Sequence, residues 1–163
     1  MANTKLILAI DSSLACPAFS VLLFDLDNRT VEVVQLEHVK TNSKKPTGHR
    51  LDQIDKMLDY LTHHYDFDEV VMEKGFNKFA TATQQIQRTV GLLLFRMWTW
   101  KGYEIAEIAP TTVKKALTGS GKASKQEVAD ALESYVGQIK YANNDESDAT
   151  GVGIAYGKQK GWL

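Results

Sequence analysis

The sequence predicts an α/β fold, namely a five-stranded mixed sheet whose first three strands form an antiparallel meander, with helices on both faces. Three observations predict it. An apolar run near the N-terminus ends in Asp11, and two more strand-like runs follow across short turns. A helical segment then leads to a fourth strand that ends in Glu73. The rest of the chain contains one more strand among helical segments, the order expected when helices cross over a sheet.

Composition places the chain among ordinary globular proteins. Its 163 residues fit a single domain, residues 1–163, and 44% hydrophobic with 24% charged residues give no sign of disorder. Because no membrane span or signal peptide is evident, we expect a cytoplasmic protein without membrane contact. The lone Cys16 excludes an internal disulfide and is expected to be a small buried residue. At a net charge of −1, phosphate-binding lysines would have to gather on one face.

The first strand, residues 6–10, carries no charge and is rich in branched side chains, which indicates burial on both faces. Asp11 stands where this strand leaves the core. A carboxylate there costs free energy unless a cation meets it, so a lysine, an arginine or a metal ion should lie nearby. The alternative is a structural one, since Asp-Ser-Ser also suits a tight turn.

Residues 18–24 and 31–37 follow as the second and third strands of the meander. Residues 40–50 are polar and basic and contain proline and glycine, so we expect a mobile loop. Residues 51–61 place apolar side chains at intervals of three and four, which predicts an amphipathic helix.

The fourth strand, predicted over residues 68–73, resembles the first, because its apolar residues 70–72 again lead into a carboxylate, Glu73. A helix separates the two strands, so they can lie parallel and bring Glu73 beside Asp11 at one edge. A long helix is predicted over residues 80–100. Its second half, residues 90–98, is apolar almost all round and must be covered on two sides, by the sheet and by either a partner subunit or a second layer of the same chain.

A fifth strand is predicted over residues 103–108, and Pro110 begins a short helix that the glycines near residue 120 end. Ser124 and Glu127 have the spacing of a capping box, which opens a helix over residues 128–136. Four lysines lie in this region, namely Lys114, Lys115, Lys122 and Lys125. They could contact phosphates or form a solvated surface.

The last helix starts near Asn144, the expected N-cap, and puts Asp145 and Asp148 on one face. Acidic residues in a first turn can serve only to offset the helix dipole. Small residues over 149–155 are less ordinary, because each glycine costs a helix about 1 kcal/mol relative to alanine. They indicate that this helix packs closely and holds its acidic face against the edge of the sheet.

Together these elements predict four carboxylates at one edge. Such an oxygen-rich site suits hard divalent cations, with Mg²⁺ expected and Mn²⁺ able to substitute. Two ions about 4 Å apart can activate a water and stabilise the leaving oxygen of a phosphodiester. We therefore expect metal-dependent phosphodiester hydrolysis.

The segment 109–125, APTTVKKALTGSGKASK, resembles the Pro, Val-Lys, Gly-x-Gly, Ala-x-Lys signature of the RuvC Holliday-junction resolvases. Ile10-Asp11, Glu73 and the Asp145-x-x-Asp148-Ala149 run match the acidic tetrad of that family. The chain is most similar to the phage-encoded branch found in lactococcal phages. It departs from the family in having Asp11-Ser12-Ser13 where Asp-Pro-Gly is usual.

The resemblance implies a ribonuclease H-like fold, a homodimer, and cleavage of Holliday junctions and other branched DNA near the crossover, in the host cytoplasm if a phage encodes the protein. It implies that Asp11, Glu73, Asp145 and Asp148 are catalytic metal ligands. The aromatic that opens base pairs in the family corresponds to Phe76. The DNA-binding set expected here is Phe76, Lys74, Lys78, Lys114, Lys115, Lys122 and Lys125.

Three alternatives remain at this stage. A ribonuclease H-type enzyme acting on RNA/DNA hybrids would share the acidic cluster, and a junction-binding protein without activity would share the lysines. An actin-like nucleotide-binding fold also opens with a hairpin and an aspartate, but the chain is short for two lobes.

Overall fold

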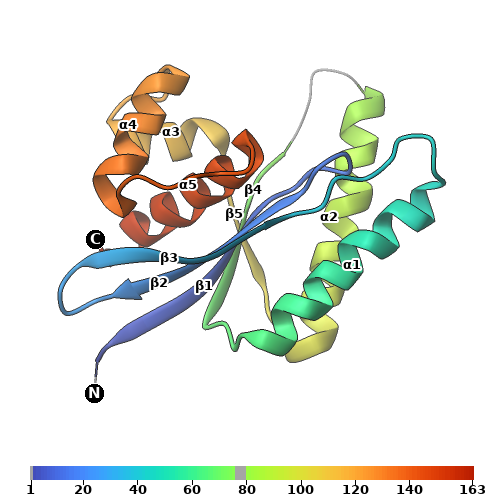
Figure 1. Ribbon diagram of the computed structural model, residues 1–163, viewed down its shortest axis with the longest axis horizontal. Coiled ribbons are helices and arrows are strands. Elements are labelled where there is room, and N and C mark those ends of the chain that lie inside the picture. Colours follow the sequence, from blue (N-terminus) through green and yellow to red (C-terminus); the bar gives the residue numbers. More distant parts are fainter. Residues whose placement is uncertain (1, 76–79) are drawn as a thin grey trace.

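The computed structural model describes residues 2–75 and 80–163, with side chains omitted for 80–82. It contains the predicted five-stranded sheet, in the order β3-β2-β1-β4-β5 (Figure 1). β1 pairs antiparallel with β2, and β2 with β3, whereas β1–β4 and β4–β5 are parallel. The mixed sheet with its opening meander is thereby confirmed. The strands are β1 (Thr4–Asp11), β2 (Ala18–Asp25), β3 (Thr30–His38), β4 (Glu69–Glu73) and β5 (Ile105–Ile108).

β1 lies in the middle of the sheet and is buried on both faces, as its apolar run predicts. Ile7 and Ala9 belong to one hydrophobic cluster, and Leu8 and Ile10 belong to another. All four side chains are fully buried. Because successive side chains of a strand point to opposite faces, one strand anchors two separate cores.

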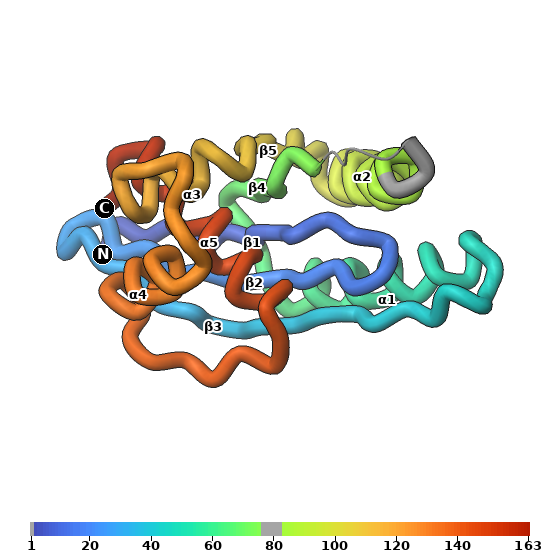
Figure 2. The backbone as a smooth tube through the Cα atoms, turned by 90° about the horizontal axis from the view of Figure 1, so that it is seen from above, coloured from blue at the N-terminus to red at the C-terminus, as the bar shows by residue number. Residues whose placement is uncertain are grey.

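The helices divide between these two cores, and Figures 1 and 2 show them on opposite sides of the sheet. One layer holds α1 (Thr47–His64) and α2 (Ala80–Lys101). The other holds α3 (Pro110–Thr118), α4 (Lys125–Val136) and α5 (Asn144–Gln159). The amphipathic spacing in α1 is confirmed, because Ile54, Leu58 and Leu61 are fully buried.

α5 lies directly on the strands β1 and β2, as its small residues predict. A Cβ added at Gly153 would stand 2.2 Å from Leu22 Cδ1 and 2.9 Å from Ala9 Cβ, so this helix position excludes any side chain. The hydroxyls of Ser20 and Thr150 add a buried hydrogen bond of 3.0 Å between β2 and α5. The helix axis is therefore fixed relative to the strand that ends in Asp11.

Three local expectations were wrong. The expected loop 40–50 ends at Pro46 because α1 already begins at Thr47, and Arg50 is buried with its Nε donating to Thr41 Oγ1 at 2.9 Å. The N-cap of α5 is Asn143, one residue earlier than expected, since its Oδ1 accepts from the Glu146 amide at 3.0 Å. Cys16 is only half-buried.

The helix boundaries near the lysine group follow the local signals. Pro110 opens α3, and Gly119 ends it in the left-handed conformation, with φ of 85°. Ser124 and Glu127 form the reciprocal capping box, so α4 begins at Lys125 rather than at residue 128. Among the described residues, no helix has the length and apolarity needed to cross a membrane.

Candidate active site

Three carboxylates converge where β1 leaves the sheet. Asp11 ends β1, and Asp145 and Asp148 lie in the first two turns of α5. One oxygen from each lies within 4.8 Å of the others, which is the spacing that allows one cation to touch all three. Asp11 and Asp145 are half-buried, and Asp148 is exposed. The residues therefore present their oxygens at a surface that solvent and a substrate can reach.

Glu73 stands at the same end of the sheet. It is the last residue of β4, which pairs parallel with β1. In this pairing Met72 is aligned with Ile10. Glu73 and Asp11 are the next residue of each strand, so they lie at neighbouring strand ends. The group of three close carboxylates does not include Glu73. Its charge nevertheless raises the pKa of Asp11, which indicates that the two carboxyl groups are electrostatically coupled. The structure thus brings the predicted residues to one edge, three of them with oxygens within 4.8 Å of one another and Glu73 beside them.

The four carboxylates repel one another. Burial, and after it the charges of Glu73, Asp148 and Asp145, together raise the pKa of Asp11 to about 8. Burial and then the charge of Asp148 raise the pKa of Glu73. Burial and then Asp145 raise the pKa of Asp148, which the charges of Lys125 and Lys114 oppose. Carboxylates arranged in this way favour a bound proton or a cation.

A divalent ion fits this donor set. Within the described part of the chain, none of the four carboxylates forms a salt bridge, so their charge is only partly offset by the lysines nearby. Carboxylate oxygens are the ligands that hard cations such as Mg²⁺ and Mn²⁺ prefer. Asp11, Asp145 and Asp148 could hold one ion, and Glu73 lies where it could contribute to a second.

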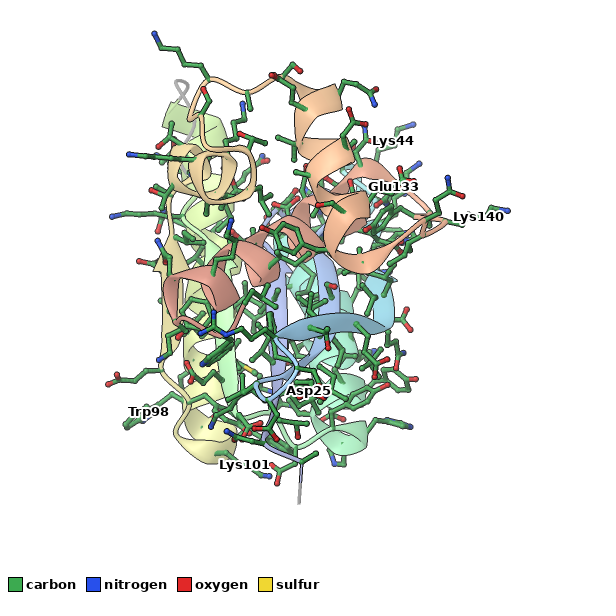
Figure 3. The ribbon with its side chains drawn as sticks, turned by 90° about the vertical axis from the view of Figure 1, so that its left-hand side faces the viewer. Asp25, Lys44, Trp98, Lys101, Glu133 and Lys140 are labelled. Atoms are coloured by element: carbon green, nitrogen blue, oxygen red, sulfur yellow. The ribbon has the colours of Figure 1, made fainter. Side chains whose placement is uncertain are left out.

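A groove of about 980 Å³ opens beside the carboxylates, between α3, α4 and the segment that leads into α5. Glu73 and Asp148 line it, and so do Lys114 and Lys125. The groove therefore joins the acidic edge to two of the lysines that the sequence assigned to DNA. In Figure 3 the labelled Glu133, which also lines the groove, marks the α4 wall.

The other expected DNA-binding residues are placed differently. Lys74, Lys115 and Lys122 are exposed, and among the described residues they are not part of the groove lining. Phe76 and Lys78 lie outside the described residues. The structure thus brings Lys114 and Lys125 to the carboxylates and leaves the other three described lysines on the surrounding surface.

Sequence reasoning missed Glu146, which lies between the two aspartates of α5. Its side chain is buried, with Oε1 2.8 Å from His38 Nδ1 and Oε2 accepting from the Ala142 amide at 2.9 Å. In the sequence it is one more acidic residue in the first turn of a helix, where a favourable interaction with the helix dipole is enough to explain its presence. Its burial against β3 distinguishes Glu146 from an ordinary first-turn acid, and no local sequence pattern predicts that burial.

Cys16 is also part of the surroundings of the site. Its Sγ accepts from Asn143 Nδ2 at 3.6 Å. Burial and the neighbouring charge of Asp145 raise the pKa of the Cys16 thiol. The thiol is therefore held in its neutral form and is not an activated nucleophile.

Comparison with known proteins agrees with this arrangement. The family model "Crossover junction endodeoxyribonuclease RuvC" matches residues 7–156. Proteins of that name from Rhizobium johnstonii and Rhizobium rhizogenes are 27% and 29% identical to the chain over 162 residues, which cover 99% of this chain and 94% of each relative.

Solved structures share the fold. RuvC of T. thermophilus in complex with a Holliday junction substrate superposes with a TM-score of 0.86 at 20% identity, covering 96% of both chains. The yeast mitochondrial Holliday junction resolvase Ydc2 gives a TM-score of 0.64 at 11% identity, over 96% of this chain and 80% of that one. Because the family model matches nearly the whole chain, the chain belongs to the RuvC family of crossover junction endodeoxyribonucleases.

Proposed function

We propose that this protein is a metal-dependent, structure-selective endonuclease that cleaves Holliday junctions and other branched DNA near the crossover, in recombination or in phage DNA processing. The observation that carries the proposal is the convergence of Asp11, Asp145 and Asp148 within 4.8 Å in a member of the RuvC family. Two Mg²⁺ ions are the expected cofactor, with Mn²⁺ able to substitute, and we place the reaction in the cytoplasm of the bacterial cell. Assignment to a phage-encoded branch stays a prediction.

Asp11, Glu73, Asp145 and Asp148 would hold the ions. When bound, such ions lower the pKa of a coordinated water and stabilise the charge on the leaving oxygen of a phosphodiester. The cluster without ions repels phosphate, because its carboxylates carry like charge. Selective binding of the scissile strand must therefore come from other groups of this chain.

Lys114 and Lys125 are placed to supply that attraction. Both line the groove that Glu73 and Asp148 also line, so a phosphate held by their ammonium groups lies beside the carboxylates. Both lysines also lower the pKa of Asp148, which places their charges within electrostatic reach of it. We assign them to the phosphates that flank the cut and keep Lys74, Lys78, Lys115 and Lys122 as contacts to the more distant DNA arms. Phe76 remains the proposed wedge at the junction centre.

Resolution of a four-way junction requires two symmetric cuts, and we propose that a homodimer makes them. The second copy has a suitable surface on α2. Leu94, Phe95 and Trp98 are 42%, 67% and 59% exposed, although they lie on one side of a helix whose opposite side packs on the sheet. Figure 3 shows Trp98 projecting from the edge of the molecule. Burial of these side chains against a second copy would remove an apolar patch from water.

The decisive experiment is a cleavage panel in Mg²⁺, Mn²⁺, Ca²⁺ or EDTA. The substrates are four-way junctions, three-way junctions, flaps, linear duplex and an RNA/DNA hybrid. We expect symmetric cuts in the four-way junction with Mg²⁺ or Mn²⁺, leaving 5′-phosphate and 3′-hydroxyl ends, and none in EDTA. Asp11→Asn and Glu73→Gln should bind junctions and not cut them. Cutting of the hybrid alone would indicate a ribonuclease instead, and binding without cutting would indicate an inactive junction-binding protein.

A further inference from the structure

We propose that the start of α1 is a second phosphate-binding site, in which Lys44, Lys45, Arg50 and the first backbone amides of the helix hold a backbone phosphate of the bound DNA away from the cut. The inference rests on the proposed function and names a further contact to the same substrate. It depends on three features of this segment, namely an uncapped helix, a buried arginine without a counter-ion and two exposed lysines.

The N-terminus of α1 carries backbone donors without partners. Pro46 precedes the helix and provides no side-chain cap, and the first turn contains no acidic residue. Within the described residues, the amides of Thr47, Gly48 and His49 donate no hydrogen bond. The helical bonds begin with Arg50, whose amide donates to the Pro46 carbonyl at 3.2 Å. A Cβ added at Gly48 would meet no described atom beyond its own stretch of helix within 4 Å, so the space beside these amides is open. The free amides and the helix dipole together favour an anion here.

The side chain of Arg50 is a buried charge without a counter-ion. Arg50 is 6% exposed, and its Nε donates to Thr41 Oγ1 at 2.9 Å. Among the residues that the structure describes, no carboxylate lies within 4.0 Å of the guanidinium. Its two terminal nitrogens donate no hydrogen bond in this part of the chain, and they are not sealed from solvent. Because a buried charge costs free energy unless an opposite charge meets it, this guanidinium indicates an anion as the missing partner.

Two lysines stand directly before the helix. A turn fixes them, because the Lys44 amide donates to Asn42 Oδ1 at 2.9 Å and the Lys45 amide donates to the Asn42 carbonyl at 3.0 Å. Both side chains are exposed, and neither forms a salt bridge with a described residue. His49 and Arg50 add basic groups to the first turn of α1, where cations oppose the helix dipole. A bound phosphate removes this conflict, because it attracts the basic side chains and the helix N-terminus alike.

Hydrogen bonds hold this segment against the connection that follows Asp11. The Thr41 amide donates to the Ala15 carbonyl at 2.9 Å, and the Thr41 hydroxyl donates to the Leu14 carbonyl at 2.6 Å. Both carbonyls belong to the connection between β1 and β2, which begins directly after Asp11. The arginine that bonds Thr41 is therefore linked through two short steps to the strand that carries the first carboxylate.

The proposed site lies at the end of the molecule that carries the acidic edge. β1 starts at Thr4, which pairs with Asp25, and it ends at Asp11. Figure 3 shows Lys44 at the opposite end of the molecule from the labelled Asp25. In Figure 1 the connection into α1 lies on the α1 and α2 side of β1, whereas the lysines of the groove belong to the other helix layer. A DNA backbone that crosses the acidic edge therefore meets cations on both sides of the cut.

The first test compares junction binding by the wild type and by the double variant Lys44→Ala, Lys45→Ala. Because the variant loses one phosphate contact, its affinity at about 0.1 M salt should fall roughly tenfold, and the slope of log K against log salt concentration should fall by about 1. Fluorescence anisotropy in Ca²⁺ measures both. Cleavage in Mg²⁺ at saturating protein should keep the wild-type rate, because the contact lies away from the cut. Lys56→Ala, an exposed lysine later in α1, is the control and should change neither quantity.

The second test places a negative charge at the open start of the helix. Gly48→Asp and Gly48→Asn introduce side chains of nearly equal size, and both replace a helical glycine, so neither should lower the Tm of the free protein. Gly48→Asp should even have the higher Tm of the two, because an acid in the first turn complements the dipole. It should nevertheless bind junctions about fivefold more weakly than Gly48→Asn, and high salt should remove that difference.

Wild-type affinity and salt slope in the double lysine variant would overturn the inference, as would equal junction affinities of Gly48→Asp and Gly48→Asn. Binding of Mn²⁺ without DNA, followed by electron paramagnetic resonance, should be the same in all these variants. A change in Mn²⁺ binding would assign the effects to the metal site and would also overturn the inference. A wild-type protein that shows both binding effects but cuts no junction would overturn the proposed function and leave this phosphate site in place.

Discussion

His38 Nδ1 lies 2.8 Å from Glu146 Oε1 and thereby ties the last residue of β3 to the first turn of α5. β3 is an edge strand, and α5 carries Asp145 and Asp148 on either side of Glu146. The second carboxylate oxygen of Glu146 accepts from the Ala142 amide at 2.9 Å. A buried acid thus joins three segments of the chain directly behind the acidic edge.

Glu146→Ala should therefore disturb the candidate metal site without removing a ligand. It leaves the Ala142 amide and the His38 ring without this partner, which should lower the free energy of unfolding by about 1–3 kcal/mol. Binding of Mn²⁺ in the absence of DNA should weaken by about tenfold or more. Urea unfolding and paramagnetic resonance measure the two effects.

Glu146→Gln keeps an acceptor for the Ala142 amide and should recover most of both losses. Glu32→Ala removes an exposed glutamate from the same strand as His38 and serves as the control. Unchanged Mn²⁺ binding in Glu146→Ala would show that the network supports stability alone.

Asp11 should make the metal-free protein less stable at alkaline pH. Its pKa is raised to about 8 in the folded protein, chiefly by burial, whereas the pKa of an aspartate in an unfolded chain is about 3.9. Between these values the folded state holds a proton that the unfolded state has lost, so the free energy of unfolding falls as pH rises. Thermal unfolding in EDTA from pH 5 to pH 8 should show a declining Tm.

Asp11→Asn cannot ionise and should flatten that decline, so it should be more stable than the wild type at pH 8 in EDTA. Mg²⁺ should also raise the wild-type Tm at pH 8, because an ion that binds the folded state stabilises it. Parallel Tm curves for wild type and variant in EDTA would argue against a raised pKa at Asp11.

Lys114→Ala should weaken junction binding and reduce its dependence on salt. If Lys114 contacts one phosphate, the slope of log K against log salt concentration should fall by about 1. Fluorescence anisotropy in Ca²⁺, over a series of salt concentrations, measures the slope. Lys56→Ala, an exposed lysine of α1 paired with Asp52, should leave it unchanged. A slope equal to that of the wild type would remove Lys114 from the interface.

The double substitution Phe95→Glu with Trp98→Glu should convert a dimer into a monomer. It places two charges on the exposed apolar side of α2, where they would be buried in the assembly without partners. Light scattering after gel filtration should give half the wild-type mass. Ser134→Glu, at an exposed position of α4 in the layer on the other face of the sheet, should leave the dimer intact. A monomeric wild type would contradict the proposed assembly.

Local signals in the sequence determined the elements and their order. The uncharged run of β1 indicated a strand buried on both faces, and the spacing of Ser124 and Glu127 indicated a capping box at a helix start; the structure confirms both. The close packing of α5 was readable from its glycines, and Gly153 indeed allows no side chain against Leu22. The start of α1 was misjudged because its basic first turn is held by tertiary contacts such as the one between Arg50 and Thr41.

The tertiary structure decided what those elements build together. Residues 11 and 145 are far apart in the chain, and only the seating of α5 on β1 and β2 brings their carboxylates within one ion's reach. The groove and the burial of Glu146 against His38 likewise arise where separate helices and an edge strand meet. Sequence by itself determined which side chains can carry charge at the ends of strands and helices, because that depends on local periodicity and capping. Their spacing, their shifted pKa values and the space beside them were decided by packing, which depends on contacts between distant segments.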